Sequence, residues 1–360
     1  PKEVKKDEGR VALIPEHITQ FTGLADIFVE TNAGLGSGFT DEDYESAGAK
    51  IVPNAQELYG VSEIICKVKE PQEQEFELLR SSHVIFGYLH LASNLSLTKM
   101  LLEKKLTAIA TEMIMDENEY PLLIPMSKIA GNLAIQKGMQ FLEYSSEGKG
   151  LLLSSISDER NSKVTVIGCG EVGRSSIHKS IQIGASVTAI DLDENILSEL
   201  KNKYGENIST HISGSDEATE AIRSADLVVG AVLLPGRKPP IVITQDDIEQ
   251  MEKGSVIVDV AIDQGGCVEG VTANTHSEPF EIRNGVIISA IANLPGAVPK
   301  TSSIELSTNM QKYVDNLLID NWFSEYSKNE NLKPSLQIHN GLLLSEEVAE
   351  SLSLSLSKLV

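Results

Sequence analysis

The sequence has few cysteines, few aromatic residues and little positive charge. Its three cysteines, Cys66, Cys169 and Cys267, lie about 100 residues apart, without a Cys-x-x-Cys pair or a neighbouring histidine at zinc spacing. This pattern predicts no structural metal and favours a reducing compartment. Aromatic residues make up 5% of the chain and hydrophobic residues 41%, a globular composition that excludes a disordered or fibrous chain.

Positive charge is scarce because 30 Lys and Arg residues stand against 52 Asp and Glu residues. The formal net charge of −22 repels phosphate backbones and anionic membrane surfaces, so we expect no nucleic-acid partner. No apolar run approaches the roughly 18 residues needed to cross a bilayer, and residues 1–6 are not a signal peptide. A cytoplasmic protein without a membrane partner is therefore expected. Because the sequence begins at Pro rather than Met, we also expect a few preceding residues, such as a short first strand.

A length of 360 residues exceeds one ordinary mixed α/β domain and suits two. In the first third, β-rich apolar runs alternate with helical patterns, which predicts a parallel α/β sheet. These runs lie at residues 27–29, 63–68, 83–88 and 107–110. A second alternation predicts the buried strands of a second doubly wound sheet. Its runs lie at residues 164–167, 186–190, 227–232, 255–260 and 286–290.

Long helices are expected between and after these two alternations. Ser127 can cap a helix that continues to about Ser145, in which Ile129, Leu133, Gln136 and Gln140 recur at helical spacing. Residues 304–326 are also mainly helical, and we expect them to pack on the first domain. The fold class is therefore α/β, with two Rossmann-like, doubly wound parallel-sheet domains joined by long helices and separated by a cleft.

A glycine motif follows the first strand of the second alternation. Gly168, Gly170 and Gly173 form Gly-x-Gly-x-x-Gly between an apolar strand and a helix. In that context the first glycine allows a tight turn, the second lets the backbone approach a pyrophosphate, and the third permits close helix–strand packing. The phosphates face the helix N-terminus. Cys169, between two of the glycines, is expected to be a small filler rather than a reactive thiol.

Asp191 ends the next strand, 18 residues after Gly173. A carboxylate there accepts hydrogen bonds from the ribose hydroxyls and repels a 2′-phosphate, so the motif predicts NAD rather than NADP. The alternative is an ordinary α/β turn with a solvated Asp at a strand end. We therefore assign residues 122–299 to an NAD-binding Rossmann domain, and residues 1–121 and 300–360 to a substrate or catalytic domain.

Two groups of basic residues are candidates for substrate binding. Arg10 lies beside an apolar segment and could hold a carboxylate bidentately, although such an arginine is often a surface ion-pair residue. Lys67 and Lys69 follow an apolar run, which places them at the carboxyl end of a strand, where α/β sheets bind ligands.

Two further residues are candidates for proton transfer. His90 follows another strand between apolar neighbours, and it is either a general acid or base or a hydrogen-bonded core histidine. Asp263 lies just past an apolar strand and before Gly265 and Gly266, which could let the backbone approach a ligand. The alternative for Asp263 is a turn-forming Asp.

Seven stretches, in order along nearly the whole chain, resemble the alanine dehydrogenase family. They are residues 8–13, 67–71, 89–92, 125–131, 230–236, 259–267 and 292–295. The resemblance implies that Arg10 and Lys69 bind the substrate and that His90 and Asp263 are the catalytic pair. It also implies cofactor contacts beyond the glycines, from Ser127, Glu171, Val172, Asp191, Ser213, Val232, Leu233, Val260, Ala261, Ile262, Asp263, Ile291, Ala292, Asn293 and Leu294.

The activity implied by this resemblance is the reversible, NAD-dependent oxidative deamination of L-alanine to pyruvate and ammonium, by a homo-oligomer that is commonly a hexamer. The expected site lies in the interdomain cleft. At two cofactor positions the chain departs from the family, since Ile196 stands where a basic residue is usual and Thr272 where Arg is usual. These departures remove charge on the adenosine side of NAD and leave the predicted chemistry unchanged.

Three other functions are compatible with the same patterns. One is a dehydrogenase of another amino or imino acid, of the saccharopine or opine type. A second is the nucleotide-binding component of a transhydrogenase, against which residues 259–266 and the pair Lys69 and His90 argue. A third is an NAD-binding sensor without chemistry, against which the presence of all four candidate residues argues.

Overall fold

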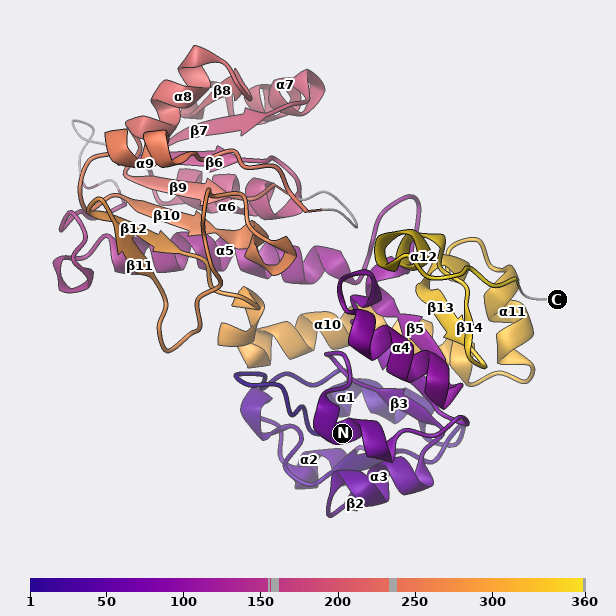
Figure 1. The fold of residues 1–360 in the computed structure, drawn as a ribbon. Helices are drawn as coiled ribbons and strands as arrows, with labels where there is room; N and C mark the ends of the chain where they lie inside the picture. The colour runs from indigo at the N-terminus through magenta and orange to yellow at the C-terminus, as the bar shows by residue number, and fades with distance from the viewer. Residues whose placement is uncertain (155, 157–161, 233–237, 359–360) are drawn as a thin grey trace. The chain divides into compact units, whose positions relative to one another are not determined.

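The computed structural model describes residues 1–154, 156, 162–232 and 238–358 (Figure 1). The chain divides into two compact units. Unit 1 comprises Pro1–Met126 and Val298–Val360, and unit 2 comprises Ser127–Ala297. The chain passes between the units within helix α5 (Leu123–Phe141) and again just before helix α10 (Pro299–Val314). The assignment of substrate to one unit and NAD to the other remains a prediction.

Unit 1 contains a five-stranded sheet of order β14-β13-β5-β4-β3. The first three strands in sequence run parallel, the fourth pairs antiparallel with the third, and the fifth pairs antiparallel with the fourth at the edge of the sheet. The strands are β3 (Ile64–Cys66), β4 (Val84–Gly87), β5 (Thr107–Ala110), β13 (Leu336–His339) and β14 (Leu342–Leu343). Every residue of β4 and β5 is buried, so the apolar runs form the centre of this sheet.

The predicted strand at residues 27–29 forms, but in a separate sheet. Strand β1 (Phe28–Glu30) pairs in parallel with β2 (Lys50–Val52) in a two-stranded sheet. The sequence pattern predicted strand β1 correctly but not its pairing with β2, because pairing depends on contacts distant in sequence.

The helices of unit 1 surround these sheets. They are α1 (Pro15–Ile18), α2 (Asp41–Ser46), α3 (Ala55–Val61), α4 (Leu95–Lys104), α10, α11 (Trp322–Lys328) and α12 (Glu346–Leu352). Helices α10 and α11 confirm the helical prediction for residues 304–326, and both belong to unit 1. The hydroxyls of Ser303 and Ser307 on α10 each accept a backbone N–H bond of 2.9 Å, from Val11 and Ile14 respectively. These bonds fasten the segment around Arg10 to α10.

Unit 2 is built on a seven-stranded sheet of order β11-β12-β10-β9-β6-β7-β8. All neighbouring pairs are parallel except β11 and β12. The strands are β6 (Lys163–Ile167), β7 (Ser186–Asp191), β8 (Ile208–Ile212), β9 (Leu227–Gly230), β10 (Val256–Asp259), β11 (Glu281–Arg283) and β12 (Val286–Ser289). From β6 the order runs outward to β8 on one side and to β12 on the other, so the doubly wound prediction is confirmed.

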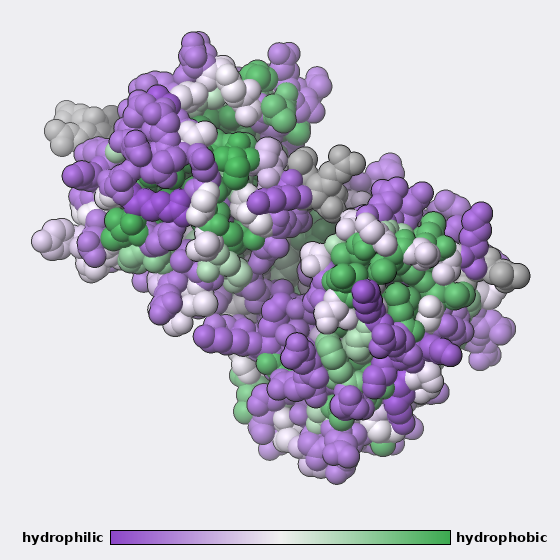
Figure 2. Space-filling model, viewed as in Figure 1, coloured by the Kyte–Doolittle hydropathy of each residue, from purple (hydrophilic) through white to green (hydrophobic). Residues whose placement is uncertain are grey.

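Four helices of unit 2 connect these strands, namely α6 (Glu171–Gln182), α7 (Glu194–Tyr204), α8 (Asp216–Arg223) and α9 (Gln245–Gln250). Among the described residues there is no helix with the length and apolar character that crossing a bilayer requires. On the face in Figure 2, hydrophilic side chains cover most of each unit, and apolar side chains gather over α4, β14 and α12 of unit 1.

Helix α5 begins earlier than predicted, so the prediction of Ser127 as its cap is wrong. The helix starts at Leu123, because the N–H groups of Leu123 and Ile124 bond to the Tyr120 carbonyl. Pro125 falls in the first turn, where a missing N–H leaves no helical bond unmade. Ser127 therefore lies one turn inside the helix.

Candidate functional site

The carboxyl ends of six strands in unit 2 lie along one edge of the sheet. Strands β12, β10, β9, β6, β7 and β8 are consecutive and parallel, so the residues after each strand meet at that edge. The predicted cofactor residues at strand ends fall there: Gly168, Asp191, Ser213, Val232, residues 260–263 and residues 291–294. Leu233 lies outside the described residues. The strand order reverses between β6 and β9, which is where open α/β sheets bind ligands.

The glycine loop has the geometry that its spacing predicts. Gly168 has a left-handed backbone with φ of 88°, and a Cβ there would lie 2.5 Å from the Ala231 carbonyl oxygen. A Cβ at Gly173 would lie 1.9 Å from the Gly168 carbonyl oxygen. Among the described residues, a Cβ at Gly170 would meet no atom within 4 Å beyond its chain neighbours, so none of them fills the space beside the backbone before α6. Two glycines are thus required by packing, and the third leaves the start of α6 accessible.

The start of α6 suits an anion. The helix is 12 residues long, and Glu171 and Val172 lie in its first turn. The first N–H groups of a helix have no acceptor within the helix, and its dipole places partial positive charge there. Burial and, to a smaller extent, the charge of Asp191 raise the pKa of Cys169 to about 12, which favours the filler role for this thiol.

Asp191 is held against the glycine loop. One carboxylate oxygen accepts the Cys169 N–H at 2.6 Å, and the other accepts the Asp193 N–H at 3.0 Å. Ser213, directly after the neighbouring strand β8, lies at the same edge of the sheet, because its N–H bonds to the Asp191 carbonyl at 2.9 Å. The carboxylate is therefore fixed beside the loop, while the residue remains partly exposed.

Asp259 and Asp263 occupy different environments after β10. Asp259 is 1% exposed, and its carboxylate accepts the N–H groups of Ala261, Cys267 and Val268 at 3.0, 2.8 and 3.1 Å. Asp263 is exposed, and its Oδ1 accepts the Asn293 N–H at 3.0 Å. Asp259 shapes the turn and Asp263 is accessible, so the role of turn former belongs mainly to Asp259.

In unit 1, three parallel strands also end side by side. Lys69 follows β3 and His90 follows β4, and the Tyr88 N–H bonds to the Val68 carbonyl at 3.1 Å. A Cβ at Gly87 would lie 2.5 Å from the Lys67 carbonyl oxygen, so the two chains approach closely here. The structure therefore brings the predicted Lys69 and His90 to one edge of the sheet.

His90 is not a core histidine. Its side chain is 52% exposed, and its ring stacks on Tyr88 with centroids 6.2 Å apart and planes 16° apart. The backbone of His90 is left-handed, with φ of 47° and ψ of 42°. Glu112 accepts its N–H at 2.7 Å. His90 is thus available for proton transfer in a constrained conformation.

Arg10 is not a surface ion-pair residue either. It is 2% exposed and forms a bidentate contact with Glu8, with Nε–Oε1 of 2.7 Å and Nη2–Oε2 of 2.5 Å. Its Nη1 lies 3.3 Å from the Met126 sulfur. Burial lowers the pKa of Arg10, but the hydrogen bonds and charge of Glu8 outweigh it and raise the pKa. The guanidinium therefore stays charged with its plane fixed.

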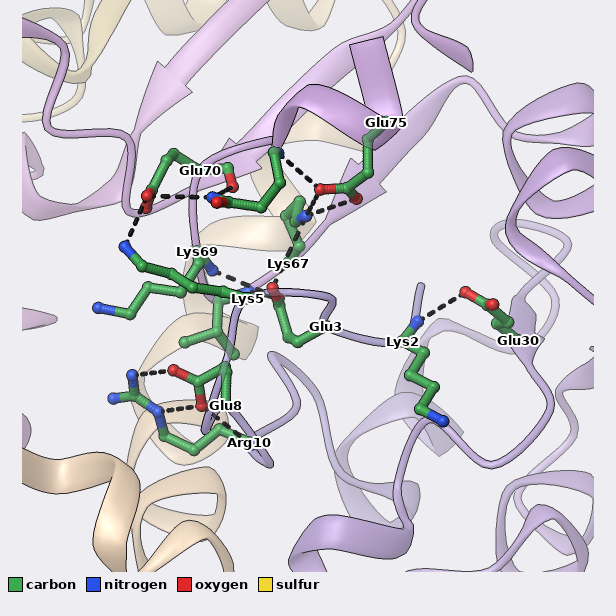
Figure 3. A network of polar contacts seen from close by, with 12 residues as sticks. Lys2, Glu3, Lys5, Glu8, Arg10, Glu30, Lys67, Lys69, Glu70 and Glu75 are labelled. Carbon is green, nitrogen blue, oxygen red and sulfur yellow. Dashed lines mark hydrogen bonds and ion pairs between the residues drawn. The ribbon is translucent and has the colours of Figure 1, made fainter. Parts of the chain in front are cut away.

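Lys67 and Lys69 have separate roles (Figure 3). Lys67 is fully buried, with Nζ 2.7 and 2.8 Å from the two Glu75 oxygens and 3.6 Å from Glu3. The Glu3 carboxylate also accepts the N–H groups of Val68 and Lys69 at 2.5 and 3.3 Å. Lys67 is thus a buried anchor of the loop, whereas the ends of the Lys69 and Arg10 side chains lie on the same side of this network in Figure 3.

The sequence patterns missed the carboxylates that hold these cations and His90. Glu8 lies two residues from Arg10, but no periodicity distinguishes it from other acidic residues. Glu112 follows β5 just as His90 follows the parallel strand β4. Comparing the residues after consecutive strands could therefore have found Glu112. Glu3 and Glu75 lie 64 and eight residues from Lys67, and their contacts need the fold.

The reversal of strand order and the glycine loop at that point define a Rossmann-type dinucleotide-binding domain, the class found in NAD-dependent oxidoreductases. Two family descriptions match the chain: Alanine dehydrogenase/PNT, N-terminal domain, over residues 1–130, and Alanine dehydrogenase/PNT, C-terminal domain, over residues 134–346. The chain therefore belongs to the alanine dehydrogenase/PNT family of oxidoreductases, and the sequence-based resemblance is confirmed.

Similar proteins cover nearly the whole chain. The alanine dehydrogenase of Bacillus subtilis is 43% identical over 98% of this chain and 93% of its own, and that of Methanococcus maripaludis is 40% identical over 98% and 95%. A solved L-alanine dehydrogenase has a TM-score of 0.93 and 38% identity, with 98% of each chain covered. A transhydrogenase from Sinorhizobium meliloti has a TM-score of 0.81 and 25% identity, with 96% and 98% covered.

Proposed function

We propose that this chain catalyses the reversible, NAD-dependent oxidative deamination of L-alanine to pyruvate and ammonium. The main support is the identity of 43% over 98% of the chain to an alanine dehydrogenase. The placement of Lys69 and His90 at adjacent strand ends adds support from this chain's own residues.

The residues at the edge of the unit 2 sheet fit NAD. The pyrophosphate would lie at the start of α6, where Gly170 leaves open space. Asp191, already held beside the loop, would accept hydrogen bonds from the ribose hydroxyls. The other proposed contacts come from Ser127, Glu171, Val172, Ser213, Val232, Leu233, residues 260–263 and residues 291–294. When bound, NAD would accept the hydride from the substrate Cα.

Arg10 and Lys69 would fix the substrate. Arg10 has a fixed, charged guanidinium because of Glu8, and it would bind the carboxylate. Lys69 would bind the carbonyl or amine region. Two cations on one substrate would restrict the orientation of a small amino acid, and correct orientation of the reacting carbon is a large part of catalysis.

His90 and Asp263 would move protons. His90, half exposed, would exchange a proton with the substrate nitrogen or oxygen. Asp263, exposed and bonded to the Asn293 N–H, would orient or activate the water that converts the imine to pyruvate. In the balanced reaction, L-alanine, NAD and water give pyruvate, ammonium, NADH and one proton, and His90 would take up the proton that the substrate nitrogen loses.

A substrate panel tests the proposal directly. Purified protein with NAD or NADP and individual amino acids should produce NADH with L-alanine and little reduced cofactor with NADP. Turnover of a bulkier amino or imino acid in place of L-alanine would favour the saccharopine or opine type. Hydride transfer only between two nucleotides would favour the transhydrogenase component, and dinucleotide binding without turnover would favour a sensor.

The variant His90→Asn tests the proposed proton transfer. Asn tolerates the left-handed backbone of residue 90, so this substitution removes the imidazole and keeps the backbone conformation. We expect kcat to fall by about 100-fold or more, with the thermal unfolding midpoint nearly unchanged. His178→Asn, at an exposed histidine on α6, is the matched control. Undiminished turnover in His90→Asn would contradict the role.

A homo-oligomer, and by family resemblance a hexamer, is also part of the proposal. Light scattering coupled to size-exclusion chromatography would measure the number of chains. A monomer at micromolar concentration would contradict it.

A further inference from the structure

Glu112 binds the His90 backbone through its carboxylate, and this residue is buried. It lies in the 3₁₀ helix η5 (Thr111–Met113), directly after β5, and is 6% exposed. Its Oε1 accepts the N–H of Leu89 at 3.2 Å and that of His90 at 2.7 Å, and its Oε2 also lies 3.2 Å from the Leu89 nitrogen. One carboxylate thus binds two consecutive backbone N–H groups.

Those two contacts act on a strained part of the chain. The left-handed conformation of His90 is disfavoured for residues other than glycine. Such a conformation persists only when surrounding contacts determine it, and it concentrates at functional sites. Because charge-assisted hydrogen bonds are stronger than neutral ones, the Glu112 carboxylate stabilises this turn more than a neutral acceptor in the same place would.

Glu112 also acts on the imidazole. Its Oε1 lies 3.7 Å from His90 Nδ1, which is too long for a hydrogen bond but close enough for electrostatic attraction. An Nδ1–H pointing at the carboxylate is favourable, whereas a lone pair on Nδ1 would be repelled. The carboxylate therefore favours the Nδ1–H tautomer and leaves the lone pair on Nε2.

Other charged and titratable groups surround this pair. Glu347, on α12, faces Glu112, and its pKa is raised by burial and by the Glu112 charge. Tyr88 stacks on the imidazole, and burial raises the pKa of its hydroxyl while Arg10 lowers it. Glu347 has the same charge as Glu112, so it provides a test of whether negative charge alone matters.

We propose that Glu112 is the positioning residue for His90: it fixes the left-handed backbone of His90 and selects the tautomer that presents Nε2 to the substrate. The predicted effect of Glu112 on turnover rests on the proposed function, whereas its predicted effects on the backbone and the tautomer of His90 do not. The inference adds to that function a residue that touches neither substrate nor cofactor.

Two variants separate the two effects of Glu112. Glu112→Gln keeps an oxygen that can accept the Leu89 and His90 N–H groups but loses the charge. Glu112→Ala loses both. We expect kcat for L-alanine to fall about 10-fold in Glu112→Gln and about 100-fold in Glu112→Ala, with the KM for NAD within twofold of wild type. Glu347→Gln should keep kcat within twofold.

A spectroscopic measurement without substrate reads the tautomer itself. Isotope-edited infrared spectra of histidine-labelled protein, with the His90→Asn spectrum subtracted, separate the Nδ1–H from the Nε2–H form. We expect Nδ1–H alone in the wild type and in Glu347→Gln, and a mixture in Glu112→Gln. A crystal structure of Glu112→Gln should retain positive φ at residue 90.

The outcomes are distinguishable from failure of the proposed function. If the wild type oxidises no L-alanine, the proposed function fails, while the tautomer spectra still decide the role of Glu112. An unchanged tautomer in Glu112→Gln would overturn the inference. So would a folded Glu112→Ala protein, verified by circular dichroism, whose kcat stays within twofold of wild type.

Discussion

The two units hold their candidate site residues in different ways. In unit 2 the candidate cofactor site is mainly backbone, made of glycines that packing requires and a helix start, with one side-chain carboxylate, Asp191, held by N–H groups. In unit 1 it consists of cations and a histidine, held by buried carboxylates such as Glu8 and Glu112. Backbone sites appear in sequence as contiguous motifs, whereas side-chain sites depend on partners from other parts of the chain.

The largest expected effect tests the backbone site. In Gly173→Ala, a Cβ 1.9 Å from a backbone oxygen forces the loop or α6 to move. We expect a loss of about 3 kcal/mol or more in the free energy of unfolding and no measurable NADH binding. Urea unfolding and NADH fluorescence titration measure these two quantities.

Gly170→Ala is the matched control, because its Cβ would meet no atom within 4 Å in the part of the chain that the structure describes, apart from its chain neighbours. Its stability should change by less than about 1 kcal/mol, while the Kd for NADH should rise about 10-fold because the methyl group occupies the phosphate approach. Unchanged NADH affinity in Gly170→Ala would refute the phosphate assignment.

The next effect separates the two lysines of unit 1. Lys67→Met leaves Glu75 and Glu3 buried without their cation, which should destabilise the protein by about 3–5 kcal/mol. Lys69→Met should cost less than about 1 kcal/mol but lower kcat/KM for L-alanine about 100-fold. Chemical denaturation and steady-state kinetics check the pair. Equal stability losses would remove the distinction between anchor and substrate ligand.

A smaller effect concerns cofactor choice in unit 2. Asp191→Asn keeps an acceptor for the Cys169 N–H but removes the charge that would repel a 2′-phosphate. We expect NAD affinity to fall about 10-fold, or about 1.4 kcal/mol, and the preference over NADP to narrow. Titration with both reduced cofactors measures this. A preference for NAD that stays as large as in the wild type would exclude Asp191 as its source.

The smallest effect compares the pH dependence of one carboxyl from each unit. Burial raises the pKa of Glu3 above its ordinary value of 4.5. For Asp247, burial raises the pKa, but hydrogen bonds from Thr244 and Arg223 outweigh it and lower it below 3.8. The contribution of Glu3 to the free energy of unfolding is therefore lost as pH rises from about 4.5 through its pKa in the folded protein. The contribution of Asp247 is lost as pH falls from about 3.8 through its own folded pKa.

Unfolding free energies of Glu3→Gln and Asp247→Asn, each measured against wild type from about pH 3 to pH 7, should therefore change in opposite directions. Relative to wild type, Glu3→Gln should become more stable as pH rises. Asp247→Asn should become less stable, by about 1 kcal/mol at neutral pH. If the stabilities of the two variants instead changed in the same direction with pH, the predicted difference between Glu3 and Asp247 would be wrong.

Much of unit 2 was predictable from sequence. The strand before Gly168, the spacing to Asp191 and the apolar runs at 227–232 and 255–260 each reflect local constraints, and the structure has the corresponding strands. Strands β8 and β11 were not predicted: β8 is only partly buried beyond Ile208, and the short β11 is only partly buried. Edge strands lack the continuous apolar pattern that identifies buried ones.

In unit 1 the residue types were predictable, but their environments were not. His90 and Lys69 follow strands as expected, but the exposure of His90 and the burial of Arg10 depend on neighbours far along the chain. The start of α5 was misplaced because Ser127 has the chemistry of a cap, whereas the bonds to Tyr120 start the helix earlier. Local propensity competes with tertiary contacts, and here the contacts decided.

Gly131, which lies outside the Gly-x-Gly-x-x-Gly motif, has a consequence for mutational surveys of this chain. A Cβ at Gly131 would lie 2.3 Å from the Val172 carbonyl oxygen, so α5 and α6 approach at their backbones. Any larger residue would push the first turn of α6 by roughly an ångström, because packed interiors have little free volume. A survey of cofactor affinity would then score residue 131 as a binding residue, although its effect is purely one of spacing. Positions that tolerate no substitution in such a survey would therefore include residues that hold the binding loop in place as well as residues that touch the ligand.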